Sequence, residues 1–177
     1  MALIQETPGV FVAEGPLAVI GPAELATLRA AAKTSPKRRA RINTHHDAED
    51  PLHEMIIAID ASSYVRPHRH PGKSEAFHVI EGEADIVIFD DDGEIDQVIR
   101  LSAPDRGRPF YYRMSEPIFH TLIVRSDILI VHEITNGPFR PAATSFADFA
   151  PDDGDTAKVD AYQAELFRRV TAFQRNG

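Results

Sequence analysis

The chain contains no cysteine among its 177 residues. Disulfide bonds and thiolate metal sites are therefore excluded, and nothing favours an oxidising compartment. Basic residues are also scarce, because 19 Lys and Arg stand against 27 Asp and Glu, and the formal net charge is −8. An acidic chain of this kind has no general attraction to nucleic acid. We therefore expect a small-molecule ligand and no nucleic-acid partner.

Long apolar runs are absent as well. No uninterrupted apolar stretch approaches the roughly 18 residues that mark a membrane span, and no signal-peptide pattern is visible at the start of the sequence. We expect a cytoplasmic protein without membrane attachment. The chain also has no nucleophile elbow, P-loop or dinucleotide-binding fingerprint, so serine hydrolysis, nucleotide hydrolysis and NAD chemistry lack support.

Short apolar segments separated by turn residues fill the middle of the chain. Strands are predicted over 53–60, 76–80, 83–89, 94–101, 119–124 and 128–134, and Asp-Asp-Gly at 91–93 indicates a hairpin. No helical pattern interrupts this stretch. The pattern therefore predicts an antiparallel barrel or jelly roll.

Helices are predicted on both sides of these strands. Residues 22–33 are helical by composition, with a proline near the first turn. Apolar residues at 159, 162, 166, 170 and 173 recur at helical steps and form one stripe. We divide the chain into an N-terminal extension (1–37), a barrel (38–139) and a C-terminal tail with an amphipathic helix (140–177). The stripe packs either on its own barrel or on a second subunit, and exposed barrel edges favour a homodimer.

Two histidines separated by one residue carry the strongest chemical signal. Alternate residues of a strand project to the same side, so His68 and His70 would point together, and Glu75 can return on the next strand. His120, from a distant strand, would complete the set. Three imidazoles and one carboxylate suit one divalent transition metal, namely Mn, Fe, Co, Ni or Zn. A histidine pair alone is common in proteins that bind no metal. The full spacing of the pair to Glu75 and Gly82 is a much more restrictive pattern, and therefore stronger evidence for a metal site.

The run from His68 to Gly82 matches the first cupin motif, H-x-H-x4-E-x6-G. Together with residues 62–70, 39–43 and 137–139, it resembles the WbuC family of cupin-fold metalloproteins over roughly residues 20–167. The resemblance implies an all-β cupin barrel, also called a double-stranded β-helix or jelly roll, with a metal held by the motif and His120. It also implies a link to bacterial surface-polysaccharide (O-antigen) biosynthesis.

The chain departs from the general cupin pattern in both motifs. Ser62 stands where the first motif has a glycine. In the second motif, Pro117 takes the usual Gly place and Val124 the usual Asn place. We therefore expect the loop before His120 to have a different shape.

Polar side chains also alternate on a segment before the first barrel strand. A strand would place them on one face, where arginine forks suit a carboxylate or phosphate. These candidate substrate-binding residues are Arg39, Arg41, Asn43 and His45. Arg66 precedes His68 by two positions and is a further candidate, whereas Lys37 and Arg38 are interpreted as a solvated charge run.

Two other side chains are candidates for acid–base catalysis. Lys73 lies in the metal-binding turn and could polarise a carbonyl or move a proton, with a solvated loop lysine as the alternative. Tyr112 could act as an acid if it faces the cavity, with outward packing as the alternative. His78 is interpreted as a non-ligand, and His53 and His132 as structural residues.

Three functions are consistent with these residues. The first is a metal-dependent isomerase, epimerase or lyase acting on a small polar, sugar-like or anionic metabolite. The second is an Fe(II)-dependent dioxygenase. The third is a non-catalytic protein that binds a small molecule through its metal. We rank them in this order.

Overall fold

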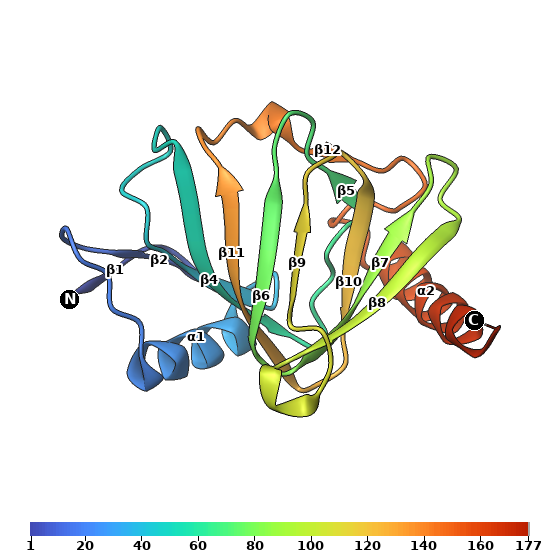
Figure 1. The fold of residues 1–177 in the computed structure, drawn as a ribbon, viewed down its shortest axis with the longest axis horizontal. Coiled ribbons are helices and arrows are strands. Elements are labelled where there is room, and N and C mark those ends of the chain that lie inside the picture. Colours follow the sequence, from blue (N-terminus) through green and yellow to red (C-terminus); the bar gives the residue numbers. More distant parts are fainter. Residues whose placement is uncertain (177) are drawn as a thin grey trace.

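Two β-sheets curve around a common interior in the computed structural model, which describes residues 1–176 (Figure 1). In spatial order, the seven-stranded sheet consists of β1 (Leu3–Thr7), β2 (Val10–Ala13), β3 (Arg39–Asn43), β4 (Leu52–Asp60), β11 (Ile128–Asn136), β6 (Glu75–Glu81) and β9 (Tyr111–Met114). The five-stranded sheet consists of β12 (Ser145–Phe146), β5 (His68–Arg69), β10 (Phe119–Val124), β7 (Glu83–Phe89) and β8 (Ile95–Ser102). The short 3₁₀ helices are η1 (Pro104–Arg106) and η2 (Pro141–Ala143).

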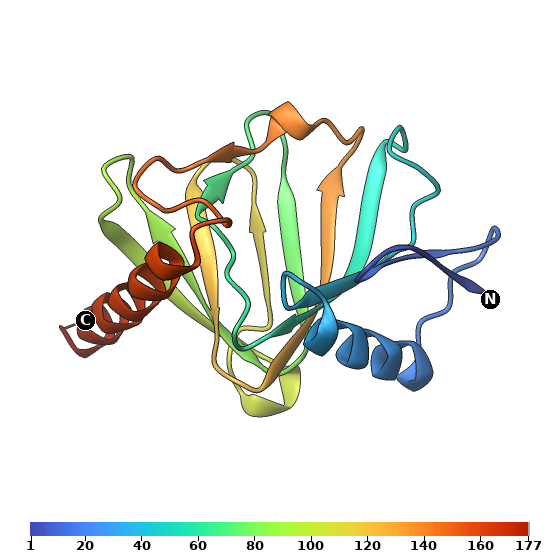
Figure 2. The ribbon, with the colours of Figure 1, turned by 180° about the vertical axis from the view of Figure 1, so that it is seen from behind.

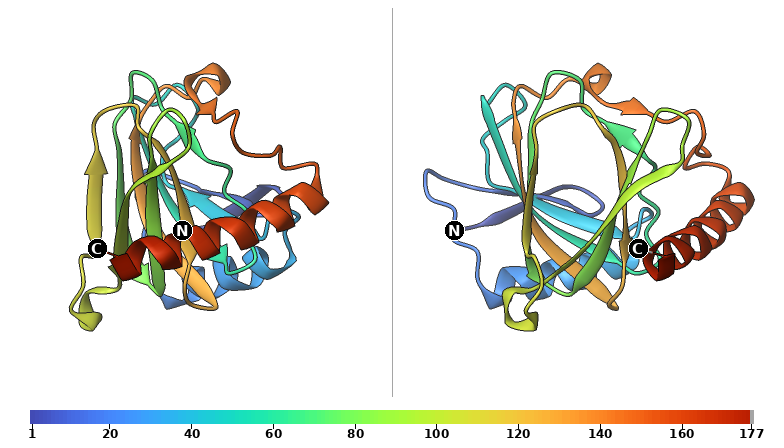
Figure 3. Two further views of the ribbon diagram at one scale, coloured as in Figure 1. Left: turned by 90° about the vertical axis from the view of Figure 1, so that its right-hand side faces the viewer. Right: turned by 45° about the vertical axis from the view of Figure 1, so that its right-hand side comes forward.

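The two sheets face each other and enclose a core, and the right-hand view of Figure 3 looks into the barrel. Alternation along each strand sends one set of apolar side chains inward, where they fill part of the interior. Members of this core include Ile59, Phe77, Val79, Ile86, Leu129 and Val131. Further along β6 and β11, Glu75, Glu133 and Thr135 line cavities instead of the apolar core.

Gly82 joins β6 to β7 in a tight turn. Its φ is 85°, and a Cβ atom at this position would lie 2.3 Å from the Ile128 carbonyl oxygen. Only glycine tolerates both the left-handed backbone and the close approach. This explains physically why the motif ends in glycine.

The N-terminal helix α1 (Pro22–Thr34) packs on the outer face of β3 and β4 (Figure 2). Leu28 and Ala32 are buried there against Ile42 and Ala58. The helix begins after Gly21, whose N–H donates to the Glu24 carboxylate at 2.9 Å. The predicted helix over residues 22–33 is therefore present, one residue longer.

The C-terminal helix α2 (Thr156–Asn176) packs on the outside of the five-stranded sheet (Figure 3). Leu166 and Val170 of the apolar stripe are buried there against Val87 and Phe119. Phe167, beside the stripe, stays 50% exposed. Much of the stripe thus covers its own barrel, and the homodimer stays a prediction.

The prediction of an all-β jelly-roll barrel flanked by two helices is confirmed. Two strands were not predicted: β1 extends the large sheet at its edge, and the short β12 pairs with β5. Within residues 1–176, neither helix has an apolar stretch long enough to cross a bilayer.

Candidate metal centre

Four side chains from separate parts of the chain meet inside the barrel. They are His68 on β5, His70 just after it, Glu75 at the start of β6 and His120 on β10, and one ligand atom from each lies within 4.8 Å of the others. His68 and His120 are direct partners in the antiparallel register. Glu75 Oε2 lies 3.1 Å from His70 Nε2, and Glu75 Oε1 lies 3.5 Å from His120 Nε2. The structure therefore assembles the four ligands expected from the sequence.

Hydrogen bonds at the far side of each ring orient the imidazoles. His68 Nδ1 lies 2.8 Å from the Arg66 carbonyl oxygen, and His120 Nδ1 lies 2.9 Å from the Ile118 carbonyl oxygen. A carbonyl only accepts, so each Nδ1 carries the proton and Nε2 keeps its lone pair for the cluster. The Thr144 hydroxyl lies 3.4 Å from Nδ1 of the third ring, His70. Such outer contacts are typical of metal-binding histidines.

Burial sets the protonation states of the cluster. Glu75 and His120 are each only 5% exposed. Burial, followed by the charge of His120, lowers the pKa of His68 to about 4. Burial alone would raise the pKa of Glu75, but its polar contacts with His120 and His70 hold it well below its ordinary value. His68 is thus neutral and Glu75 ionised at neutral pH, which are the forms that bind a cation.

These observations agree with the chemistry of a divalent transition metal. Imidazole Nε2 atoms and one buried carboxylate converge on a single point, and the donor set is all nitrogen and oxygen. Within the described part of the chain, no second group of three or more such residues converges in this way. The cluster therefore fits a metal-binding protein, although this donor set does not select one metal.

Tyr112 faces inward and contacts the cluster directly. Its hydroxyl donates to Glu75 Oε1 at 2.7 Å, and its ring stacks on Phe77 with 5.4 Å between centroids. Burial, with the charge of Glu75, raises the Tyr112 pKa well above 10. Its proton is thus held in the bond that orients Glu75, and the predicted role as a catalytic acid stays a prediction.

The cluster borders a cavity of about 720 Å³. Arg39 and Arg41 also line this cavity, and neither guanidinium forms an ion pair with any residue from 1 to 176. Burial lowers the pKa of Arg39. The ordinary pKa of arginine is so high that the side chain nevertheless stays charged. The metal cluster therefore shares its cavity with two cationic groups that an anion can pair with.

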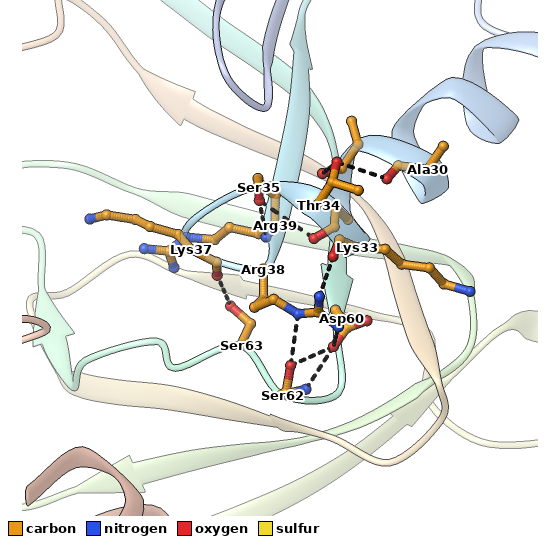
Figure 4. Close-up of polar contacts among 12 residues, drawn as sticks. Ala30, Lys33, Thr34, Ser35, Lys37, Arg38, Arg39, Asp60, Ser62 and Ser63 are labelled. Carbon is orange, nitrogen blue, oxygen red and sulfur yellow. Dashed lines mark hydrogen bonds and ion pairs between the residues drawn. The ribbon is translucent and has the colours of Figure 1, made fainter. Parts of the chain in front are cut away.

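A network of hydrogen bonds around Arg38 fixes the chain just before β3 (Figure 4). Arg38 has a left-handed φ of 55°, and its guanidinium binds Ser62 Oγ at 3.0 Å and Asp60 Oδ1 at 3.1 Å. The Asp60 N–H in turn donates to the Arg38 carbonyl at 3.0 Å. Strand alternation from this fixed point turns Arg39 and Arg41 inward. Arg38, interpreted from the sequence as a solvated charge, is partly exposed and binds two side chains, and Ser62 accepts one of these hydrogen bonds.

The other candidates from the sequence lie further away or are already engaged. Asn43, His45 and Lys73 line a second cavity of about 440 Å³ beside the first. The Lys73 ammonium donates to the Pro138 carbonyl at 2.9 Å. Arg66 lines the first cavity, but its guanidinium binds the Asp152 carboxylate and, at 3.1 Å, the Ala147 carbonyl. The predicted roles of these residues in catalysis and substrate binding stay predictions.

Glu133 on β11 was not among the site residues predicted from the sequence. It pairs in register with Phe77 of β6, and it lines both cavities. Burial, followed by the charge of Glu75, raises its pKa to about 8. Its alternation with the buried Val131 indicates an inward-facing side chain, whereas the neighbouring His132 lies 3.4 Å from Glu54 on the outer face.

Comparisons with known proteins agree with this fold. The model of a domain of unknown function, DUF6016, matches residues 20–101. No curated protein matches. An oxalate oxidase solved with the substrate analogue glycolate is similar with a TM-score of 0.51 and 12% identity, over 70% of this chain and 62% of that one. A protein from Shewanella oneidensis is similar with a TM-score of 0.50 and 9% identity, over 60% of this chain and 72% of that one.

The matched region spans less than two thirds of the oxalate oxidase chain. At these identities the likeness concerns the fold alone, and that fold is the cupin barrel. The chain is thus a cupin-fold protein whose His/Glu cluster fits a metal site. Membership of the WbuC family, a finer assignment, stays a prediction.

Proposed function

We propose that the protein is a metal-dependent enzyme that acts on a small anionic, polar or sugar-like metabolite by isomerase, epimerase or lyase chemistry. One observation carries the proposal: the unpaired guanidiniums of Arg39 and Arg41 line the same cavity as the His/Glu cluster. Arginine forks match the geometry of a carboxylate or phosphate, and their strength increases where water is excluded. The cavity is thus suited to an anion that also reaches the metal.

His68, His70, Glu75 and His120 would hold the ion, which supplies Lewis-acid polarisation of a carbonyl or hydroxyl when bound. Arg39 and Arg41 bind and orient the anionic group, which lowers the entropic cost of reaching the reactive geometry. Phe77 and Phe146 form part of the apolar wall of the cavity.

Glu133 gives the cavity a carboxyl group outside the metal cluster. It can hold or accept a proton at its carboxylate oxygen, as isomerase and lyase reactions require. Its position in the shared wall of the two cavities keeps it within the space that a ligand would occupy.

Calorimetric titration of the Zn- or Mn-loaded protein with glycolate, a minimal hydroxy acid, tests the anion site. Arg41→Met should weaken binding at least about tenfold, because loss of a charge-assisted hydrogen bond costs roughly 1.5–3 kcal/mol. Arg108→Met is the matched control, since Arg108 is exposed on a loop away from the cavity. Equal affinities of the wild type and Arg41→Met would contradict the proposed anion site.

Substrate turnover distinguishes the three functions considered from the sequence. Turnover that persists without oxygen and with Zn supports the proposal, whereas strict dependence on Fe(II) and oxygen would replace it with the dioxygenase. Saturable binding without turnover on any metal would favour a binding protein. The link to surface-polysaccharide biosynthesis and the cytoplasmic location rest on the sequence alone and stay predictions.

A further inference from the structure

A second cavity of about 440 Å³ adjoins the metal cavity. The two share part of their walls, including Arg41, His70 and Glu133. The second cavity extends past these residues to Asn43, His45 and His53, none of which lines the first cavity. A ligand anchored at the metal can therefore extend past Arg41 into a second polar space.

Two stacked histidines form part of the wall of this second space. The rings of His45 and His53 are 4.0 Å apart between centroids and 6° from parallel. His45 Nδ1 lies 3.1 Å from the Glu54 carbonyl oxygen, so this nitrogen carries a proton. Burial, and to a smaller extent His53, lower the pKa of His45. The neutral His45 ring thus keeps Nε2 as a hydrogen-bond acceptor.

Two polar atoms of residues that line this space have no hydrogen-bond partner within residues 1–176. Asn43 Oδ1 and His53 Nε2 are shielded from solvent, and neither forms a hydrogen bond within the described chain. His53 as a whole is only 4% exposed. Buried polar atoms are normally paired, and an unpaired one destabilises the fold. Asn43 and His53 both line the second cavity, so a ligand bound there lies next to both side chains.

The chemistry of these atoms selects the ligand. Asn43 Oδ1 and His45 Nε2 accept hydrogen bonds, and His53 Nε2 donates or accepts according to its tautomer. A hydroxyl group both donates and accepts, so hydroxyls suit all three atoms. The adjacent Arg41 suits a carboxylate.

We propose that the second cavity binds the hydroxylated chain of a polyhydroxy carboxylate whose acidic end lies at Arg41 and the metal cluster. The substrate is thus a sugar-acid type of molecule, longer than a two-carbon acid. This inference rests on the proposed function, because it assumes that the first cavity holds the carboxylate.

Three acids test the inference by calorimetric titration of the Zn- or Mn-loaded full chain. Glycolate reaches only the first cavity, whereas gluconate and hexanoate have six carbons each and differ in their hydroxyls. Gluconate should bind at least about tenfold more tightly than hexanoate, the factor expected for one or two buried hydrogen bonds. Asn43→Ala and His53→Phe should each weaken gluconate about tenfold and leave glycolate unchanged.

His78→Phe is the matched control for His53→Phe, because His78 lies on the outer face of β6 beside Phe110. Asn43→Ala keeps the test decisive if His53→Phe unfolds. If gluconate and hexanoate bind with equal affinity while glycolate still binds, the proposed hydroxyl-binding site is wrong and the proposed anion site stands. Variants that weaken glycolate and gluconate equally would overturn the hydroxyl-binding site too. Failure of all three acids to bind would overturn both this inference and the proposed anion site.

Discussion

Replacing Tyr112 by phenylalanine should weaken metal binding while leaving the fold intact. The Tyr112 hydroxyl donates to Glu75 Oε1 at 2.7 Å, and the ring stacks on Phe77. Tyr112→Phe removes the hydrogen bond but keeps the stacked ring. Glu75 would then lose one of the groups that hold its carboxylate in the cluster.

The size of the effect follows from the type of bond that is lost. A hydrogen bond to an ionised group contributes roughly 1.5–3 kcal/mol, more than a neutral bond. Loss of a contact that orients a metal ligand typically costs about 10- to 100-fold in metal affinity, which corresponds to a similar free energy. We therefore expect the dissociation constant for Zn to increase within this range.

Competition with a chromophoric chelator measures this dissociation constant. Tyr111→Phe is the matched control, since Tyr111 is the neighbouring residue on β9 and is 48% exposed. The reasoning fails if the Zn affinity of Tyr112→Phe stays within about twofold of the wild type. If turnover is then lost while affinity is unchanged, Tyr112 acts as the catalytic acid predicted from the sequence.

Four further predictions concern the metal, pH, the core and self-association. His120→Ala should lose most bound metal by elemental analysis, and full stoichiometry in that variant would show that the coordination sphere is wrong. Burial raises the Glu133 pKa to about 8, so the contribution of the protonated Glu133 to the stability of the apo-protein is fully present below about pH 4.5 and is lost as the pH rises through about 8. Glu133→Gln should remove this loss of stability between pH 5 and pH 9, as measured by urea unfolding at the two pH values. Asp85 is fully buried between two arginines, and Asp85→Ala should cost about 3 kcal/mol of unfolding free energy, with a value below about 1 kcal/mol contradicting the expectation. Light scattering should report a homodimer for the full chain, which a monomer at tens of micromolar would refute, and a version ending at Phe149 should melt earlier because it lacks the buried face of α2.

Local spacing in the sequence determined much of this site. The alternation of a strand is a property of the backbone, so it places His68 beside His70, and Arg39 beside Arg41, wherever the strands lie. The return of Glu75 after a short turn is equally local. For these reasons the common face of His68 and His70, and that of Arg39 and Arg41, could be predicted without knowledge of the fold, whereas the place of His120 depends on the pairing of β10 with β5.

Contacts between distant strands could not be predicted from local spacing and became visible only in the tertiary structure. Glu133 faces the cavity because β11 pairs with β6, and His53 stacks on His45 because β4 returns beside the segment after β3. The amphipathic stripe of α2 was equally compatible with a partner and with its own barrel, because periodicity shows that a face is buried and not what buries it. Register and packing depend on which strands become neighbours, and that choice is made by the whole chain at once.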